Sequence, residues 1–480
     1  MLKTILLFLL TPFLLLASSS QENISKQAIV KIYTTAKISN YQSPWSSSMR
    51  SSTGSGAIIE GGYILTNAHV VANQAFIEVE RYGQRKRYIA RVYAVSHQAD
   101  LALLKVDEEM FFEGVKPLSF GELPQVEQRI VVYGYPMGGN TLSATIGVVS
   151  RVEHHSYAHS GEAFLAIQVD AAVNPGNSGG PALSDGKIVG VVMQVISQSQ
   201  NIGYLVPVSM VKHFIEDMKD QHYDGFADLG IATQKLENPA MRRYYGLEDN
   251  ISGKLITKVS PALLTSKILK EGDILTAVDG HNIEDDGTVE FRKYEYTHYQ
   301  YFIDAYQMGQ EVKLNIIRNH KALEVKVKLK ETADDIYIVP TTRYDKMPSY
   351  FVYGSYVFSP LSRNLIISTK RNRLGLSHLS TLWQNDQKKE SVVLLKVLAS
   401  DMSRGDNNFG MWSIDKINGE DFKDFKDFQY KMQHSKTPFI LLEDNDGIQV
   451  IIDRKEALKK QKTILQKYNI EFDKSIDLRK

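Results

Sequence analysis

The chain has 480 residues, of which 43% are hydrophobic and 23% are charged. This composition is ordinary for globular protein and argues against large-scale disorder, and one domain per roughly 150 residues predicts about three domains. Lysine and arginine number 56 and aspartate and glutamate 55, so the net charge of +1 gives no sign of a nucleic-acid or acidic-membrane partner. The absence of cysteine excludes disulfides, thiolate metal sites and a cysteine nucleophile.

Residues 1–20 have the layout of a secretory signal peptide. Lys3 precedes a mostly apolar run from Ile5 to Leu16, and small residues follow from Ala17 to Ser20. The run is shorter than the roughly 20 apolar residues that span a bilayer, and an uncleaved anchor is the alternative. No later segment is apolar enough to span. We therefore expect a soluble protein with no stable membrane span, exported to the periplasm or another extracytoplasmic compartment.

Residues 28–211 are predicted to form many short strands. Runs rich in Val, Ile and Tyr, such as "AIVKIYTT", "LALLKV" and "KIVGVVMQVI", are bounded by Gly, Pro, Asn or charged clusters. This rhythm predicts an all-β barrel or sandwich. The polar segment 40–56, "NYQSPWSSSMRSSTGSG", predicts a surface loop within it.

The segment 208–225, "VSMVKHFIEDMKDQHYDG", has apolar residues at helical spacing and ends on a glycine. It predicts a bridging helix and a domain boundary. The tail "KEALKKQKTILQKYNI" predicts one more amphipathic helix, which runs into a C-terminal tail at residues 461–480.

The C-terminal half contains a weak internal repeat. Residues 272–285 and 411–424 each place an apolar strand before an Asp-Gly or Asn-Gly turn and an acidic stretch. Two unrelated hairpins are the alternative. Because the surrounding order of elements is also similar, we predict two related small domains at 226–333 and 337–460.

The stretch "AAVNPGNSGGPAL", residues 171–183, places Ser178 in a bend rich in glycine. A serine hydroxyl near pH 7 needs a base, a group that orients the base, and donors for the oxyanion that forms. "ILTNAHVV" supplies His69 after a strand, and "SHQADLALLKV" supplies Asp100 before one. The order His, Asp, Ser, with spacings of 31 and 78 residues, is that of chymotrypsin-like barrels. We predict that these three residues form a catalytic triad.

The glycines give this bend a further role. Glycine adopts positive φ easily, so the turn is predicted to point the Gly176 and Ser178 N–H groups at one spot and form an oxyanion hole. Gly179 and Gly180 are predicted to leave room for a substrate backbone.

Each triad residue also has a structural explanation when taken alone: a structural histidine, a turn aspartate and a flexible turn. Three unrelated segments in one order and spacing favour the triad. Other candidates are weaker: His97 lacks a strand-to-loop context, Asp107 is predicted to end a strand, and Asp170 to hold the active-site loop. The pair His154–His155 suggests metal, but no acidic motif accompanies it, and we predict a solvated loop there. Neither a Walker loop nor HExxH is present, so no metal or other cofactor is expected.

Segments between residues 53 and 210, among them "GSGAIIEGGYILTNAHVV", "ADLALLKV", "GYPMGG" and "QVDAAVNPGNSGGPAL", resemble the signature segments of the HtrA/Deg family of trypsin-like serine proteases, in order. The resemblance implies a mainly β fold whose protease domain, residues 21–215, is a chymotrypsin-like double β-barrel. It makes His69 the general base, Asp100 its orienting group and Ser178 the nucleophile. It also implies a pocket lined by Ile202, Gly203 and Tyr204 for a small or medium apolar side chain.

The C-terminal half resembles two PDZ-like α+β domains. By this resemblance Leu229, Gly230 and Ile231 receive a peptide carboxylate, and the following strand adds a peptide by β-augmentation. The second unit departs from the pattern, because "YGSYVFSPL" has no glycine where Gly230 stands and Gly354 comes too early. Packing against a neighbouring subunit is the alternative for that unit.

The resemblance implies an ATP-independent endopeptidase that cleaves unfolded or damaged exported proteins, with unfolded proteins and peptide C-termini as partners. It also implies a homotrimer or a multiple of trimers. Val30, Ile32 and Tyr33 could be trimer contacts, although core is the preferred interpretation. Two other functions stay open: a chaperone or scaffold with an idle protease site, and a signalling protease that cuts one partner in a stress response.

Overall fold

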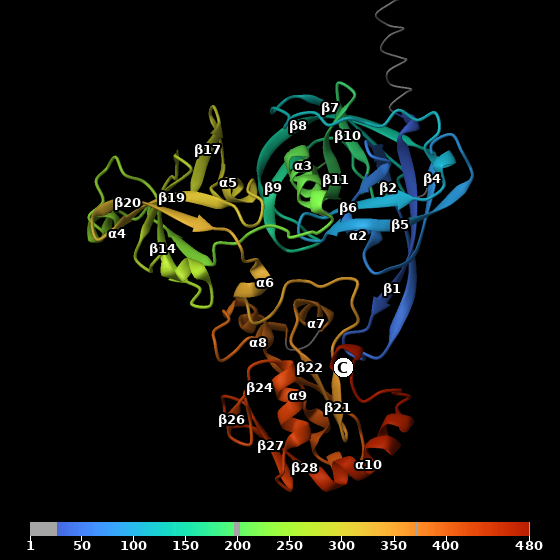
Figure 1. Ribbon diagram of the computed structural model, residues 1–480, viewed down its shortest axis with the longest axis vertical. Helices are drawn as coiled ribbons and strands as arrows, with labels where there is room; N and C mark the ends of the chain where they lie inside the picture. The colour runs from blue at the N-terminus through green and yellow to red at the C-terminus, as the bar shows by residue number, and fades with distance from the viewer. Residues whose placement is uncertain (1–25, 138, 140, 196–201, 370–372, 480) are drawn as a thin grey trace, which may run out of the picture.

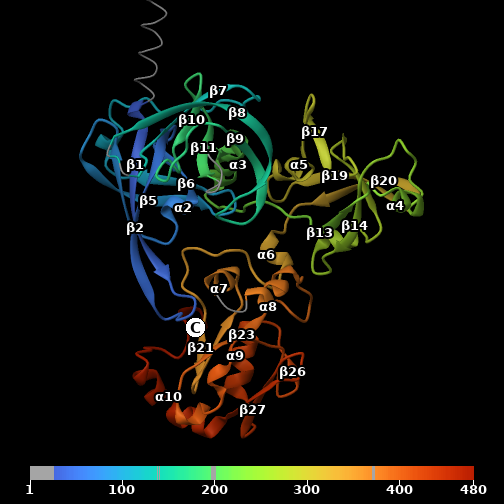
Figure 2. The same ribbon diagram turned by 180° about the vertical axis from the view of Figure 1, so that it is seen from behind.

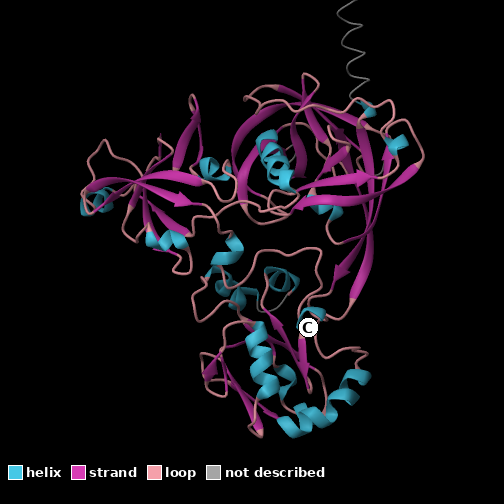
Figure 3. Ribbon diagram, in the orientation of Figure 1, coloured by secondary structure: helices cyan, strands magenta, loops and turns pink. Residues whose placement is uncertain are grey.

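The computed structural model describes residues 26–137, 139, 141–195, 202–369 and 373–479. The expected signal peptide lies outside these residues. The described chain forms a two-barrel unit (26–225), a middle unit (226–333) and a C-terminal unit (337–479). Figure 1 shows the middle unit beside the two-barrel unit and the C-terminal unit below both, and Figure 2 shows the same arrangement from behind. Strands dominate the two upper units, and helices gather in the C-terminal unit (Figure 3).

Two closed barrels make up the two-barrel unit and confirm the mainly β double-barrel expectation. The first has the order β1-β2-β3-β6-β5-β4. Its strands are β1 (Ile29–Ser39), β2 (Ser47–Ile59), β3 (Tyr63–Thr66), β4 (Gln74–Arg81), β5 (Arg87–Ser96) and β6 (Leu101–Val106), and the short helix α2 (Ala68–Val71) follows β3. Val30 and Ile32 are fully buried within it, as the core interpretation predicts. Tyr33 is half-buried instead, and its hydroxyl donates to Glu80 Oε2 at 2.8 Å.

The second barrel has the order β10-β11-β12-β9-β8-β7. Its strands are β7 (Arg129–Gly134), β8 (Ser143–Ser156), β9 (Ala163–Val169), β10 (Pro181–Ser184), β11 (Lys187–Val195) and β12 (Gly203–Pro207). The predicted bridging helix is confirmed as α3 (Val208–Asp217), which buries Val211 and Phe214.

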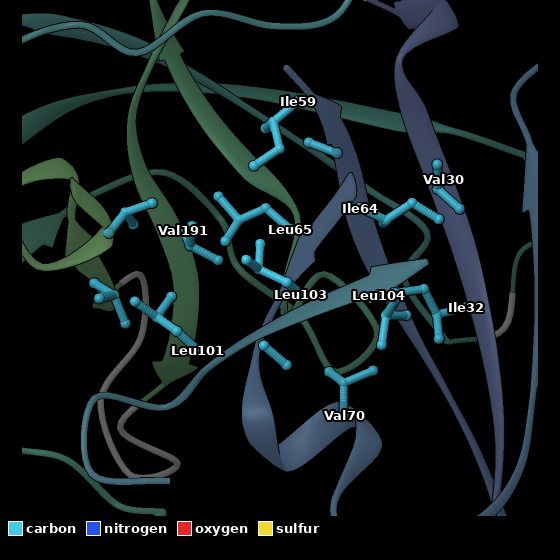
Figure 4. Packing of buried hydrophobic residues seen from close by; sticks show 14 of the residues in the cluster. Val30, Ile32, Ile59, Ile64, Leu65, Val70, Leu101, Leu103, Leu104 and Val191 are labelled. Carbon is cyan, nitrogen blue, oxygen red and sulfur yellow. The ribbon is translucent and has the colours of Figure 1, made fainter. Parts of the chain in front are cut away.

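Side chains from both barrels share one core. Figure 4 shows aliphatic residues of β1, β3 and β6 gathered around one interior, with Val191 of β11 beside them. Val70 of α2 and Leu101 at the start of β6 lie in the same cluster and are 6% and 0% exposed. Burying such a side chain contributes about 2 kcal/mol. The core therefore anchors the two segments that carry His69 and Asp100.

The loop expected at residues 40–56 is wrong over most of its length. Residues from Ser47 onward belong to β2 and pair with β1, from Ser39↔Ser47 to Ile29↔Ala57. Serine and threonine without an apolar face gave no strand signal, and the pairing with β1 imposes the strand. The tip packs on the C-terminal unit, where the Trp45 and Tyr350 rings lie 5.8 Å apart and Lys396 Nζ donates to Ser43 Oγ at 2.9 Å.

The middle unit is a sheet of order β13-β14-β15-β19-β20, with β13 at an edge. Its elements are β13 (Ile231–Lys235), α4 (Pro239–Tyr244), β14 (Lys254–Val259), β15 (Ile274–Val278), β16 (His281–Asn282), the hairpin β17 (Thr288–Arg292) and β18 (Glu295–His298), α5 (Gln300–Asp304), β19 (Glu311–Arg318) and β20 (Lys321–Lys328). The hairpin docks on the two-barrel unit, since Arg292 Nη1 donates to the Pro124 carbonyl at 2.8 Å.

The C-terminal unit follows α6 (Ala333–Ile336) and contains two four-stranded sheets. The first joins β21 (Phe351–Tyr353), β22 (Tyr356–Pro360), β23 (Val392–Val397) and β24 (Gly410–Ile414), and the second joins β25 (Lys416–Ile417), β26 (Glu420–Asp421), β27 (Phe439–Glu443) and β28 (Gln449–Asp453). Its helices are α7 (Arg363–Ser368), α8 (Arg373–Ser377), α9 (Phe425–His434) and α10 (Arg454–Lys467). The last of these confirms the predicted tail helix.

Candidate active site

The short helix α2 presents His69 to the surface. Its neighbours Val70 and Val71 are buried in the barrel core, as Figure 4 shows for Val70. Residues on opposite sides of a helical turn point in different directions. His69 therefore stays 32% exposed at its side chain while the backbone beneath it is anchored.

Asp100 fixes the position of this histidine through two hydrogen bonds. Its Oδ2 lies 2.7 Å from His69 Nδ1, and its Oδ1 accepts the His69 N–H at 2.9 Å. Asp100 has φ of 53° and is 1% exposed, and aspartate is among the few residues that adopt positive φ readily. Asn67 fixes the turn further, since its side-chain amide donates to the Asp100 carbonyl at 2.8 Å.

This pair sets the protonation of the imidazole. Burial disfavours the charged imidazolium, but the charge of Asp100 and its hydrogen bond outweigh burial and raise the pKa of His69 above its ordinary value of 6.5. The carboxylate at Nδ1 also selects the tautomer in which Nδ1 carries the proton. Nε2 is then left as the basic atom.

The loop that carries Ser178 is held by Ser55. Ser55 N–H donates to the Ser178 carbonyl at 2.8 Å, and Ser55 Oγ donates to the Gly176 carbonyl at 2.7 Å and accepts the Tyr135 N–H at 2.8 Å. Ser55 itself is fully buried. The sequence pattern did not single out this residue, although it lies in the motif "GSGAIIEGG" that carried the family resemblance.

The glycines beside Ser178 serve the chain's own packing. A side chain on Gly179, whose φ is 84°, would place its Cβ 2.1 Å from Thr66 Oγ1 and 2.2 Å from the Ser55 carbonyl. One on Gly180 would lie 2.1 Å from the Tyr133 carbonyl. The expectation that these glycines leave room for substrate is therefore wrong, because neighbouring strands occupy the space. Because these glycines have no side chain, the Ser178 loop can pack against β2, β3 and β7.

Gly176 has φ of 101°, as the predicted turn requires. A Cβ there would lie 2.4 Å from the Tyr135 carbonyl, so only glycine fits. Within the described part of the chain, neither the Gly176 N–H nor the Ser178 N–H donates a hydrogen bond. Both expected oxyanion donors thus lie in the same short turn without a partner among those residues.

The Ser178 hydroxyl does not meet the histidine in this structure. Its Oγ lies 3.5 Å from the Met193 carbonyl, and across the described residues no hydrogen bond joins it to His69. Catalytic hydrogen bonds are often long or misaligned without substrate and tighten when it binds. The structure therefore shows a formed His69–Asp100 pair and a serine turned towards β11.

Two of the expected pocket residues, Gly203 and Tyr204, lie on β12 next to β11, and Ile202 directly precedes this strand. β12 pairs with β11 in the register Gln194↔Tyr204 and Val195↔Gly203. A Cβ on Gly203 would lie 2.7 Å from the Val173 side chain. Tyr204 is 4% exposed and stacks on His155 at 4.1 Å between ring centroids. Ile202 packs against the barrel core. The role of Ile202, Gly203 and Tyr204 as a pocket stays a prediction.

The histidine pair at 154–155 lies in strand β8, so the solvated loop expected there is wrong. His154 Nε2 lies within hydrogen-bond distance of Asp304 Oδ2, at 3.2 Å, and the two side chains are 9% and 5% exposed. The partner comes from the middle unit, 150 residues away, and no local pattern announces it. Among the described residues, no group of three or more His, Cys, Asp or Glu side chains could hold a metal ion.

The remaining weak candidates have structural partners. Asp107 pairs with Arg91 at the end of β6, and Asp170 Oδ1 accepts the Val148 N–H at 2.7 Å. His97, by contrast, belongs to a cluster with His159 and Asp345.

The expected carboxylate loop of the middle unit is already partly occupied. The Gly230 N–H donates to Oδ1 of the nearby Asp228 at 2.8 Å. Leu229 is 2% exposed, and Ile231 begins β13, whose outer edge is open in the sheet. A peptide carboxylate would have to displace the Asp228 carboxylate from this donor. Binding at Leu229, Gly230 and Ile231 stays a prediction.

In the C-terminal unit the matching strand has no open edge. β22 follows the loop that contains Gly354, and it pairs with β21 on one side and β23 on the other. β21 is itself tied to the chain end, since the Val352 N–H donates to the Asp473 carbonyl at 2.6 Å. An added peptide strand would have to displace β21 there.

Replacing Ser55 by alanine is expected to lower the free energy of unfolding by about 2 kcal/mol, because the Gly176 carbonyl and the Tyr135 N–H lose their buried partner. We expect kcat to fall about tenfold, since small misplacements of reacting groups are costly. Thermal unfolding and peptide hydrolysis measure both effects. Ser184→Ala, which removes a hydroxyl near the surface of β10, is the control. Equal rates in wild type and Ser55→Ala would show that Ser55 does not position the Ser178 loop for catalysis.

Comparison with known proteins agrees with this geometry. Residues 54–191 match the family model of the trypsin-like peptidase domain, and residues 339–477 match that of the PDZ domain. The chain is 34% identical to putative protease Do-like 3, mitochondrial, of Arabidopsis thaliana, over 96% of this chain and 82% of that protein. It is 36% identical to protease Do-like 2, chloroplastic, of the same plant, over 94% and 75%.

A solved structure, the HtrA-type protease AlgW with decapeptide, superposes with a TM-score of 0.51 at 22% identity. The match covers 65% of this chain and 99% of that one, and it shows a likeness of fold. The relatives matched over most of the chain, the double barrel and the His69–Asp100 pair all point to the same family. The chain belongs to the HtrA/Do-like family of serine proteases and is a serine endopeptidase.

Proposed function

We propose that this chain is an ATP-independent endopeptidase that cleaves unfolded or damaged exported proteins, with His69, Asp100 and Ser178 as its catalytic residues. The observation that carries the proposal is the His69–Asp100 pair at 2.7 Å. The Ser178 loop is bonded through Ser55 to the barrel that carries this pair.

The proposed reaction is acyl transfer. Ser178 Oγ turns from the Met193 carbonyl towards His69, gives its proton to Nε2 and attacks the peptide carbonyl carbon. The Gly176 and Ser178 N–H groups stabilise the oxyanion. The imidazolium then protonates the leaving amine. In the second half of the reaction His69 takes a proton from water, the water attacks the acyl carbonyl, and the proton returns to Ser178 Oγ as the ester bond breaks. Asp100 keeps its charge throughout and stabilises the imidazolium.

The middle unit is proposed to deliver substrate along the open edge of β13. An extended segment of an unfolded protein can add there as a strand, with backbone hydrogen bonds that do not depend on sequence. The AlgW protease was solved with a decapeptide, which supports a peptide ligand for this chain as well. A homotrimer or a multiple of trimers is part of the proposal on family grounds.

An extracytoplasmic location is likewise proposed. The names of the Arabidopsis relatives place those proteins in mitochondria and chloroplasts, which is compatible with a compartment other than the cytosol. In the described part of the chain, no helix is both long and apolar enough to cross a membrane.

Labelling with a fluorophosphonate serine probe tests the proposal. The purified protein is compared with Ser178→Ala, with and without an unfolded substrate. Labelling that requires Ser178 and rises with substrate supports a working and switchable protease. No labelling under any condition would reject it.

A second candidate, a chaperone or scaffold with an idle site, is favoured by one observation: the Ser178 hydroxyl faces Met193 rather than His69. Casein digestion separates the two functions. If Ser178→Ala still bound unfolded casein while the wild type bound but never cleaved it, the idle-site function would replace the protease.

Activity is expected to fall as the solution becomes acidic, with its midpoint above pH 6.5. The base must be neutral to accept the serine proton, and the Asp100 carboxylate raises the pKa of His69, so His69 gains its proton at a higher pH than a free histidine does. The pH profile of kcat/KM on a short peptide measures this midpoint. A profile that is flat down to about pH 5 would mean that another group is the base.

A further inference from the structure

Residues 337–350 form a linker between α6 and β21 at the start of the C-terminal unit, and this linker contacts the first barrel near His69 and Asp100. Asp345 in this linker accepts the Asn73 N–H on Oδ1, and its own N–H donates to Asn73 Oδ1 at 2.8 Å. Asn73 and Asp345 have φ of 58° and 60°, so both backbones take left-handed turns to face each other. Asn73 lies two residues beyond the end of α2. The linker is therefore hydrogen-bonded to the turn that follows the helix carrying His69.

The same linker also contacts His97, in the segment that leads to Asp100. His97 Nε2 lies 2.8 Å from Asp345 Oδ2, and His97 Nδ1 lies 2.9 Å from His159 Nε2. The Tyr344 ring stacks on His97 and on His159, with ring centroids 4.6 Å and 4.0 Å away. The Tyr344 hydroxyl donates to the His159 carbonyl at 2.7 Å.

His159 connects this cluster to the catalytic base. Its ring centroid lies 6.1 Å from that of His69. Burial lowers the pKa of His159 to about 4, so at neutral pH its ring is uncharged and packs between Tyr344 and His69 without repelling an imidazolium. Asp345 stays ionised: burial opposes its charge, but the hydrogen bond and charge of His97 and the hydrogen bond from the Asn73 N–H together outweigh burial and lower its pKa.

These contacts are expected to contribute little to the free energy of unfolding, although they fix the positions of the segments they join. The Asp345 side chain is 41% exposed, and an ion pair at such a site adds little to stability. The contacts nevertheless converge on the two chain segments that set the His69–Asp100 distance. A misplacement of about 1 Å at a reacting group can cost roughly 10²-fold in rate. Their loss should thus be felt in turnover before it is felt in folding.

We propose that Tyr344 and Asp345 form a linker clamp that positions the His69–Asp100 pair, so that full turnover requires this linker to be docked on the first barrel. The clamp makes the placement of the C-terminal unit a condition for catalysis. The proposal rests on the proposed catalytic roles of His69 and Asp100, and Tyr344 and Asp345 act through them without touching the substrate.

The test measures kcat and KM on a short chromogenic peptide with the full-length chain. Asp345→Ala and Tyr344→Ala are expected to lower kcat about tenfold or more and to change KM less than about twofold, because the substrate contacts remain. Tyr344→Phe keeps the ring stack and should recover most of the rate. Lys346→Ala, an exposed neighbour in the same linker, is the matched control and should match the wild type.

A double-mutant cycle with Asn73→Gly excludes a general loss of structure. Glycine accepts the positive φ at this position. Asn73→Gly removes the acceptor of the Asp345 N–H, and Asp345→Ala removes the acceptor of the Asn73 N–H. Because these two reciprocal hydrogen bonds join the same two turns, the effects of the two substitutions on kcat should not add. Thermal unfolding is measured for every variant. Unchanged kcat in both alanine variants would overturn the clamp, as would additive effects or losses that only track the unfolded fraction. If the wild type itself cleaved no peptide, the proposed function would fail first.

Discussion

Alanine at Ser178 or at His69 is expected to lower kcat by about 10⁴ to 10⁶, the largest effect of any single substitution in this chain. In the proposed mechanism the serine supplies the atom that attacks the carbonyl, and the imidazole accepts its proton. KM should change little, because neither side chain forms the pocket or the strand that holds substrate. Hydrolysis of a short peptide under saturating conditions measures kcat directly.

The double variant separates a triad from two independent residues. Ser178→Ala combined with His69→Ala should be no slower than either single variant, since the two groups act as one unit. Thermal unfolding close to that of the wild type shows that the loss is chemical. A rate within tenfold of the wild type in either single variant would sink the assignment.

Asp100→Asn is expected to lower kcat by about 10⁴ with the fold intact. The asparagine oxygen can still accept the His69 N–H, which Asp100 Oδ1 now accepts at 2.9 Å. Its amide would then face Nδ1 as a donor, which favours the tautomer with the proton on Nε2 and removes the base. The measurements are kcat on a short peptide and the chemical shifts of the His69 ring nitrogens.

Asp107→Asn is the matched control for this change. Asp107 lies seven residues further along, is exposed, and pairs with Arg91 on the neighbouring strand β5. Its loss should leave kcat unchanged, because surface ion pairs contribute little. Equal activity of Asp100→Asn and the wild type would show that Asp100 is a turn residue, the alternative that its sequence context left open.

Several parts of the molecule could be predicted from the sequence because their causes are local. Short runs of branched residues between turn formers predict strands, and both barrels contain them. Helical spacing of apolar residues before Gly225 predicted α3, and the tail pattern predicted α10. The candidate triad could be predicted from the glycine-rich bend around Ser178 and from the order and spacing of His69, Asp100 and Ser178 along the chain.

Other features have causes that lie far away in the chain. Residues from Ser47 onward carry no strand signal, yet pairing with β1 makes them a strand. His154 meets Asp304, which is 150 residues distant, and Gly179 is glycine because Thr66 and Ser55 fill the space beside it. No local pattern can report a partner that only folding brings near.

The candidate site divides along the same line. The sequence by itself determined which side chains could do the chemistry, because hydroxyl, imidazole and carboxylate are properties of single residues. Only the tertiary structure decided how they are held. Asp100 bonds to His69, Ser55 bonds to the Ser178 loop, and Asp345, from a segment far along the chain, bonds to Asn73 and His97. Catalysis depends on ångström-scale distances between segments, and such distances are set by the packing of the whole fold.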